Sequence, residues 1–278
     1  MYKETVTITN KASNGDLLQA VFLPQKGMNL ISFKRADIEV IDPSTQAEFE
    51  ERFAGLGALI GPHFHRKQDG VIPKIPDENL FPHVGRVKVR GINDPFSHGI
   101  ARYAPWISVK QTEQSISGTL TGKDLWNGVL LSTLEGQNFK MLFDAEMTAE
   151  GLSLKMSIVS DTDSLVGIHY YYRLPGGKGV VTSKISDSGN HEFRCDLSES
   201  VDANFHPFPN PLQGEITLTT DEYQLITKYQ NQSQENSWQL YHPKDASFVC
   251  IEPLSAQDPR HPNLTVSSIA IQLSILPP

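Results

Sequence analysis

Residues 139–158 read FKMLFDAEMTAEGLSLKMSI, a stretch in which apolar and more polar residues alternate on both sides of a short turn. The apolar positions are Phe139, Met141, Phe143, Ala145 and Met147 before the turn, and Leu152, Leu154, Met156 and Ile158 after it. Successive side chains of a strand face opposite sides of a sheet, so this period predicts two strands that each have one apolar face. The chain turns at Glu150-Gly151, which predicts a long antiparallel hairpin.

The same alternation recurs near both ends of the chain. Residues 6–8 and 18–22 alternate around the turn signal Asn14-Gly15, and residues 269–275 alternate again. We therefore expect an all-β fold, in which residues 1–278 form a single large sandwich of antiparallel sheets with very little helix. The one segment typical of a helix is residues 43–53, where Ser44 could cap the first turn.

Composition narrows the class of partner. The chain has 24 Lys and Arg against 32 Asp and Glu, a formal charge of -8, which argues against nucleic acid or an anionic membrane surface as the main partner. A small neutral ligand suits this charge better. No signal peptide and no run of about 18 apolar residues is visible, and two cysteines are too few for a disulfide framework. We expect a cytoplasmic protein, and no sequence signature indicates its oligomeric state.

The alternation fails between residues 60 and 106, where four of the nine histidines lie. Long loops on a β scaffold commonly carry binding residues. His63 and His65 could form a metal pair, with His83 or His98 as a third ligand. Surface and hydrogen-bonded histidines are the simpler interpretation of the same pattern.

Residues 167–175 read GIHYYYRLP, a histidine followed by three tyrosines and an arginine. Such a run supplies flat apolar faces, hydroxyls for hydrogen bonds and an imidazole that can move a proton near neutral pH, which together suit a sugar. A buried strand in which His169 is a hydrogen-bonded core residue is the structural alternative, because aromatic residues also favour strands.

Four short motifs follow one another in the order of a known family. Gly85-Arg86, His98-Gly99-Ile100-Ala101-Arg102, the His169 run and Ile251-Glu252-Pro253 together resemble the aldose 1-epimerase (galactose mutarotase-like) family. The early segment 27–33 is similar to the family's opening strand, so the resemblance covers nearly the whole chain. It implies a β-supersandwich and an isomerase that needs neither a metal nor an organic cofactor.

Interconverting the anomers of an aldose requires a base that takes the proton of the anomeric hydroxyl and an acid that protonates the ring oxygen. The resemblance implies that Glu252 is the base, that His169 is the acid and that His98 hydrogen-bonds the substrate. It also implies that Arg86 and Asp202 hold sugar hydroxyls. The apolar segment 248–251 before Glu252 indicates a strand end leaving the core, where desolvation would raise the pKa of this carboxyl.

The departures from the family pattern bear on the substrate. Tyr170 and Tyr172 stand where the family usually has proline and phenylalanine, and the elements around galactose in the best known members are not recognisable here. The form of the His98 motif is closer to members that act on hexose 6-phosphates, in which Arg102 would help to hold the phosphate. Further cations available for that role are Lys88, Arg90 and Arg173.

Besides a metal-dependent β-barrel enzyme built on His63, His65 and His83, three functions stay open at the level of the sequence. The first is an aldose 1-epimerase, and the second is a hexose-6-phosphate 1-epimerase of the same family. The third is a carbohydrate-binding protein that kept the fold without the catalysis. The presence of both a motif histidine and a motif glutamate favours an enzyme.

Overall fold

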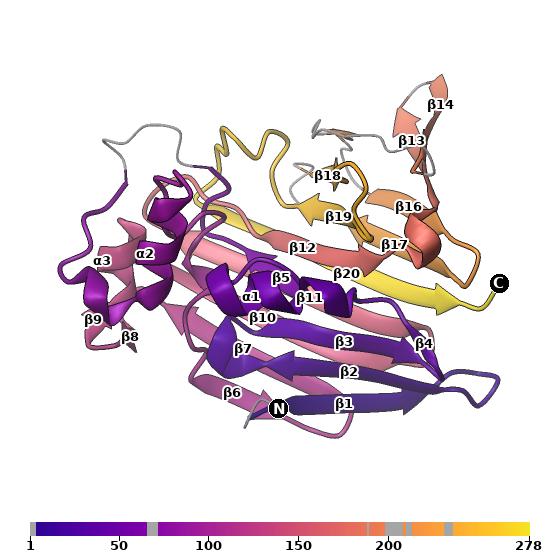
Figure 1. Ribbon diagram of the computed structural model, residues 1–278, viewed down its shortest axis with the longest axis horizontal. Helices are drawn as coiled ribbons and strands as arrows, with labels where there is room; N and C mark the ends of the chain where they lie inside the picture. The colour runs from indigo at the N-terminus through magenta and orange to yellow at the C-terminus, as the bar shows by residue number, and fades with distance from the viewer. Residues whose placement is uncertain (1–3, 66–71, 188, 198–207, 210–212, 231–235) are drawn as a thin grey trace.

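The computed structural model describes residues 4–65, 72–187, 189–197, 208–209, 213–230 and 236–278. Two antiparallel sheets of nine strands each dominate these residues (Figure 1). The expectation of an all-β sandwich of antiparallel sheets is therefore confirmed. Among the described residues, no helix has both the length and the apolar character needed to cross a membrane.

The first sheet, sheet A, has the strand order β1-β2-β3-β5-β12-β19-β18-β15, with β4 paired to β3. Its strands are β1 (Val6–Lys11), β2 (Leu17–Leu23), β3 (Asn29–Arg35), β4 (Ile38–Glu39), β5 (Gly57–Ile60), β12 (Gly167–Arg173), β15 (Phe208–Pro209), β18 (Ser237–Tyr241) and β19 (Phe248–Leu254). The turn signal Asn14-Gly15 does join β1 to β2, which pair in register from Val6 with Phe22 to Lys11 with Leu17.

The second sheet, sheet B, has the strand order β14-β13-β16-β17-β20-β11-β10-β7-β6. Its strands are β6 (Ser108–Gln111), β7 (Ser115–Thr121), β10 (Phe139–Thr148), β11 (Gly151–Ser160), β13 (Val180–Asp187), β14 (Gly189–Asp196), β16 (Gln213–Thr219), β17 (Gln224–Gln230) and β20 (Val266–Leu276). The hairpin expected over residues 139–158 is confirmed as β10 and β11, whose register pairs Met147 with Leu152. The carboxyl-terminal alternation is β20, which pairs with both β11 and β17.

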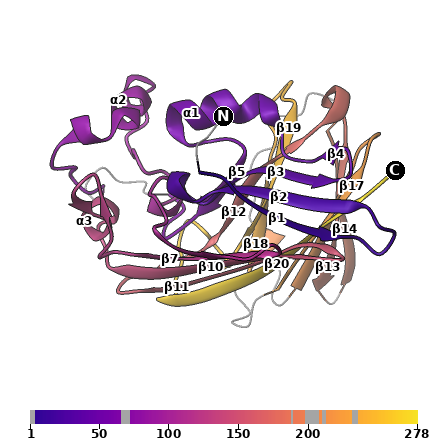
Figure 2. The ribbon, with the colours of Figure 1, turned by 90° about the horizontal axis from the view of Figure 1, so that it is seen from below.

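The two sheets lie one over the other, and α1 (Gln46–Arg52) lies on the face of sheet A that points away from sheet B (Figure 2). The core between the sheets takes its apolar side chains from both, as where Phe22 of β2 meets Phe143 of β10 with ring centroids 5.8 Å apart. Burial of the alternating apolar face is the main force that holds such layers together.

The helix expected over residues 43–53 is present as a 3-10 turn, η2 (Pro43–Thr45), followed by α1. Asp42, rather than Ser44, caps its start, because the Asp42 carboxylate accepts a hydrogen bond of 2.9 Å from the backbone N–H of Ser44. An acceptor one residue before the turn satisfies a backbone donor that the helix leaves unpaired.

Short helices replace strands between residues 61 and 107 of the described chain. These are η4 (Glu78–Leu80), α2 (Pro82–Val89) and η5 (Ile100–Arg102). The remaining short elements are η1 (Pro24–Lys26), η6 (Pro175–Gly177), α3 (Leu131–Glu135) and the small ribbon of β8 (Leu125–Trp126) and β9 (Val129–Leu130). The predicted failure of the alternation between residues 60 and 106 is confirmed.

Candidate active site

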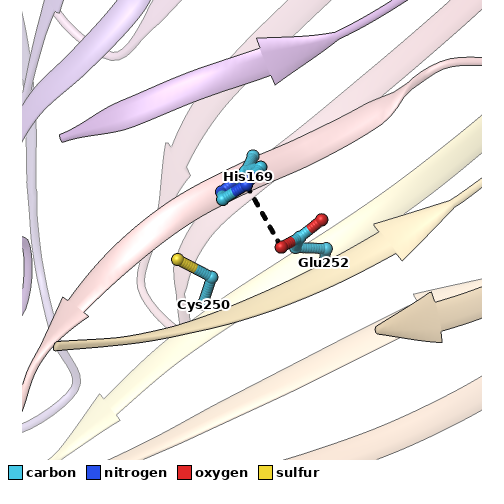
Figure 3. Close-up of side chains that lie close together, drawn as sticks. All are labelled: His169, Cys250 and Glu252. Carbon is cyan, nitrogen blue, oxygen red and sulfur yellow. Dashed lines mark ion pairs between the residues drawn. The ribbon is translucent and has the colours of Figure 1, made fainter. Parts of the chain in front are cut away.

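His169 and Glu252 come together because their strands are neighbours in sheet A. The antiparallel register of β12 and β19 pairs Tyr170 with Ile251 and Tyr171 with Cys250. Continued by one residue, this register places His169 beside Glu252, on the same face of the sheet. The His169 Nε2 atom lies 3.3 Å from Glu252 Oε1, and Figure 3 shows the two side chains directed at each other.

Both side chains line a cavity of about 760 Å³, a size typical of small-molecule sites. Aromatic rings make up much of the lining, and they come from β12, β18, β19 and the residue that follows η5. Tyr103, Tyr171, Tyr241 and Phe248 are among them. Flat apolar surfaces beside charged groups suit a ligand that has apolar faces and polar edges, as a sugar does.

His98 lies at the same cavity, with its ring centroid 5.3 Å from that of His169. The backbone brings it there through an unusual local geometry, since φ is 67° at His98 and 88° at Gly99. A Cβ atom at Gly99 would lie 2.0 Å from the carbonyl oxygen of Gly61, so only glycine allows this approach. This close approach to the carbonyl oxygen of Gly61 explains why glycine follows His98 in the sequence motif.

The electrostatics of the His169–Glu252 pair follow from its burial. Burial raises the pKa of the Glu252 carboxyl to about 8, although the charge of Arg102 acts in the opposite direction. Burial, and then the charge of Arg102, lower the pKa of the His169 imidazole well below its usual range. Both shifts favour the neutral forms of the two side chains, a protonated carboxyl on Glu252 and a neutral imidazole on His169, so one group can donate a proton and the other can accept one.

The three tyrosines of β12 divide between the two faces of sheet A. Tyr171 shares the face of His169, and the two rings stack with centroids 4.9 Å apart and an interplanar angle of 13°. Tyr170 and Tyr172 point the other way, into the core between the sheets, and both are fully buried. The departures at positions 170 and 172 thus affect the core rather than the cavity, and Tyr171 alone contributes to the site.

Arg102 is the predicted cation that the structure brings to the cavity. It is 2% exposed, and its Nε–H donates a hydrogen bond of 3.0 Å to the carbonyl oxygen of Leu59. One of its terminal nitrogens has no hydrogen-bond partner among the described residues. That N–H group is a donor for an oxygen atom of a bound ligand.

Arg86 is not brought together with the other predicted residues. It lies on the exposed side of α2, where its Nε–H donates a 2.7 Å hydrogen bond to the carbonyl oxygen of Glu51, and it is not among the side chains that line the cavity. The sequence placed the Gly85-Arg86 motif in a loop, whereas these residues continue a helix whose buried side is taken by Val84 and Val87. Asp202 lies outside the described residues.

The other cations considered for a phosphate are engaged elsewhere. Lys88 pairs with Glu78, Arg90 with Glu51 at 2.6 Å, and Arg173 with Glu222 at 2.5 Å. None of the three lines the cavity. They pair with carboxylates outside the cavity, as surface cations commonly do.

The structure also brings residues to the site that the sequence motifs do not contain. Gln239 of β18 pairs with Glu252 in the register of β18 and β19, and both polar atoms of its fully buried amide have no hydrogen-bond partner among the described residues. Arg52 of α1 and His65 line the cavity. A polar residue such as Gln239, between the apolar residues Trp238 and Leu240, is the signal that could have identified this position.

Of the histidines considered as metal ligands, His65 and His98 line the cavity with ring centroids 5.2 Å apart, whereas His63 and His83 lie outside its lining. His63 contacts two carboxylates, with Nδ1 2.6 Å from Glu135 and Nε2 3.0 Å from Asp94. His83 stacks on Tyr103 and Trp126 in a buried aromatic cluster. Among the described residues, the one group of three potential ligands that converge is His169, Cys250 and Glu252.

Comparison with known proteins supports the fold alone. No protein-family model matches the sequence, and no curated protein matches it by sequence. The galactose mutarotase-related enzyme of Lactobacillus acidophilus is similar in structure, with a TM-score of 0.62 at 16% identity over 97% of each chain. A galactose mutarotase-like protein of Lactobacillus casei has a TM-score of 0.66 at 12% identity, over 98% of this chain and 100% of that one.

A third similar structure is the aldose epimerase homologue of C. elegans, with a TM-score of 0.64 at 14% identity over 99% of each chain. All three similarities extend over nearly the full length of both chains. They agree with the two-sheet architecture of this chain. The chain therefore has the galactose mutarotase-like fold.

Proposed function

We propose that this protein is an aldose 1-epimerase, an isomerase that interconverts the α and β anomers of an aldose. The observation that carries the proposal is the buried His169–Glu252 pair, 3.3 Å apart, on the lining of a cavity of about 760 Å³. An acid and a base held side by side at a site of sugar size are what ring opening and reclosure require.

In the proposed reaction, Glu252 takes the proton of the anomeric hydroxyl while His169 protonates the ring oxygen. The ring opens, the aldehyde carbon rotates, and closure on the other face returns the proton by the same route. The pair passes between two states, with its proton on His169 before opening and on Glu252 after it. The pKa shifts favour the second state in the free protein, so contacts with the cyclic sugar would have to favour the first.

Two further side chains have the geometry to hold the sugar. One terminal nitrogen of Arg102 and the Nδ1 atom of His98 are buried beside the reacting pair without a hydrogen-bond partner in the part of the chain that the structure describes, and both could hydrogen-bond sugar oxygens. We also propose a substrate-binding role for Asp202, which rests on the sequence resemblance. The arrangement requires no metal or organic cofactor for the proton transfers.

Anomer exchange measured by NMR tests this function. Freshly dissolved α-D-glucose, galactose and glucose 6-phosphate are followed with the wild-type protein, Glu252→Gln and the surface control Glu146→Gln. We expect faster exchange of at least one sugar, a loss of about 10²- to 10⁴-fold in Glu252→Gln and no change in the control.

The possible outcomes separate the three functions. Exchange of glucose 6-phosphate alone would identify a hexose-phosphate epimerase instead. Saturable binding of a sugar without faster exchange would identify a carbohydrate-binding protein. If no sugar exchanges faster than in buffer, the epimerase proposal fails.

A further inference from the structure

Cys250 lies beside the reacting pair, although the proposed reaction gives its thiol no task. It is fully buried on β19, two residues before Glu252 and therefore on the same face of sheet A. Figure 3 shows its side chain on the same side of β19 as the side chains of His169 and Glu252. One potential ligand atom from each of the three residues lies within 4.8 Å of the other two.

The polar atoms of this group are incompletely satisfied by the protein. Both carboxylate oxygens of Glu252 and the Nδ1 atom of His169 are buried without a hydrogen-bond partner among the described residues. Buried polar atoms are nearly always paired, so the two unpaired carboxylate oxygens on the fully buried Glu252 point to a ligand. A sugar would use the groups that face the cavity, but it offers nothing that a thiol binds well.

The donor set fits one class of metal ion. An imidazole nitrogen, a sulfur and a carboxylate oxygen together are typical ligands of zinc, whereas Mg²⁺ and Ca²⁺ prefer oxygen alone. Tetrahedral zinc with bonds of about 2.0–2.3 Å needs ligand atoms about 3.3–3.8 Å apart. The separation of 3.3 Å between His169 Nε2 and Glu252 Oε1 already meets this requirement. The ligand atoms of the three residues all lie within 4.8 Å of one another, so the sulfur of Cys250 would have to move only a short distance to bind the same ion.

The charges of the group and its access from the cavity also suit a divalent ion. A thiolate and a carboxylate would balance the two charges of a divalent ion, so that the occupied site adds no net charge beside the buried guanidinium of Arg102. His169 and Glu252 line the cavity, so an ion can enter from it and can keep its fourth position open to water.

We propose that His169, Cys250 and Glu252 form a binding site for a zinc-type divalent ion, and that occupancy of this site inhibits the enzyme. This regulation rests on the proposed function, because the ion would engage both groups that transfer protons. The metal site itself does not depend on the epimerase activity. Chelation would restore the activity by freeing both side chains.

Direct binding of metal tests the site. The full-length protein, freed of metal by a chelator and kept reduced, is titrated with Zn²⁺ by calorimetry and with Co²⁺ by absorption spectroscopy. We expect one ion per chain and a thiolate-to-cobalt charge-transfer band, with no binding of Mg²⁺. Cys250→Ala should weaken Zn²⁺ binding by about 100-fold or more and abolish the band.

Cys195→Ala is the matched control, because Cys195 is the other cysteine of the chain and lies on β14 of sheet B. It should bind Zn²⁺ as the wild type does. Absence of the cobalt band, or equal Zn²⁺ affinity in Cys250→Ala, would overturn the proposed site. A thermal unfolding scan of each metal-free variant shows that it is folded.

Inhibition is measured separately, as the anomer exchange rate of each variant relative to its own metal-free rate. We expect Zn²⁺ to inhibit the wild type and Cys195→Ala at the concentration at which it binds, and Cys250→Ala only at concentrations about 100-fold higher. Exchange that Zn²⁺ leaves unchanged would refute the regulation while the epimerase stands. Metal binding by a protein without any exchange activity would refute the proposed function and leave the metal site standing.

Discussion

The β10–β11 hairpin and the β12–β19 pair are both antiparallel and both central to their sheets, yet they use their outer faces differently. Along β10, buried and exposed residues alternate regularly, so only the face toward the other sheet is covered. β12 and β19 are buried on nearly every residue of both faces. In both pairs, packing against the other sheet explains the face that is covered toward the core. In β12 and β19, the second covered face is the one that carries the cavity and its polar groups.

The β10–β11 hairpin and the β12–β19 pair therefore have different roles in the protein. Phe143 of β10 contributes to stability through packing, whereas the outer face of β12 carries His169 of the proposed proton-transferring pair. Substitutions in the hairpin should therefore change unfolding without changing the reaction, and substitutions on the outer face of β12 should do the reverse. The following variants test this difference, from the largest expected effect to the smallest.

Phe143→Ala should destabilise the protein by about 3–5 kcal/mol, because it removes a fully buried ring that packs against Phe22 and Trp106. Urea unfolding measures the loss. The exchange rate per folded molecule should stay at the wild-type value. A change in the rate at unchanged stability would contradict the assignment of this strand to the core.

Tyr171→Leu should lower the exchange rate by roughly 10-fold, because the stacked ring that orients His169 is lost, and such contacts contribute about 0.5–1.5 kcal/mol. Tyr170→Phe is the control on the neighbouring residue, whose hydroxyl is buried in the core without a partner among the described residues. It should leave the rate unchanged and the stability equal or higher. A greater loss of rate in Tyr170→Phe than in Tyr171→Leu would contradict the assignment of Tyr171 to the cavity and of Tyr170 to the core.

Arg86→Ala should change the KM for the sugar by less than about twofold, since surface changes away from a site have small effects. The side chain is exposed on α2 and does not line the cavity. Substrate titration of the exchange rate gives this value. A large rise in KM with unchanged stability would support the substrate-binding role that the sequence resemblance implies for Arg86.

Much of the fold could be predicted because alternation is a local property. Strands with one covered face, such as β10, β11 and β20, have the clear period of two that their environment imposes. β12 has no such period, since residues of both of its faces are buried. Its direction toward the cavity follows only from its neighbours β5 and β19 in the sheet.

The candidate site could be predicted in part. Short motifs identified His98, Arg102, His169 and Glu252, which the structure brings to one cavity. The pairing of Gln239 with Glu252 and the position of Cys250 depend on the register between strands, which no local pattern contains. Arg86 shows the opposite case, because a motif that matches in sequence lies on the exposed side of a helix.

The most direct test of the account is a double-mutant comparison of His169→Asn, Glu252→Gln and the variant with both changes. If the two side chains act as one proton-transferring unit, each single change should lower the exchange rate by about 10²- to 10⁴-fold, and the double change should lower it little further. Losses that multiply in the double variant, or a single variant that keeps the wild-type rate, would contradict the shared role of His169 and Glu252.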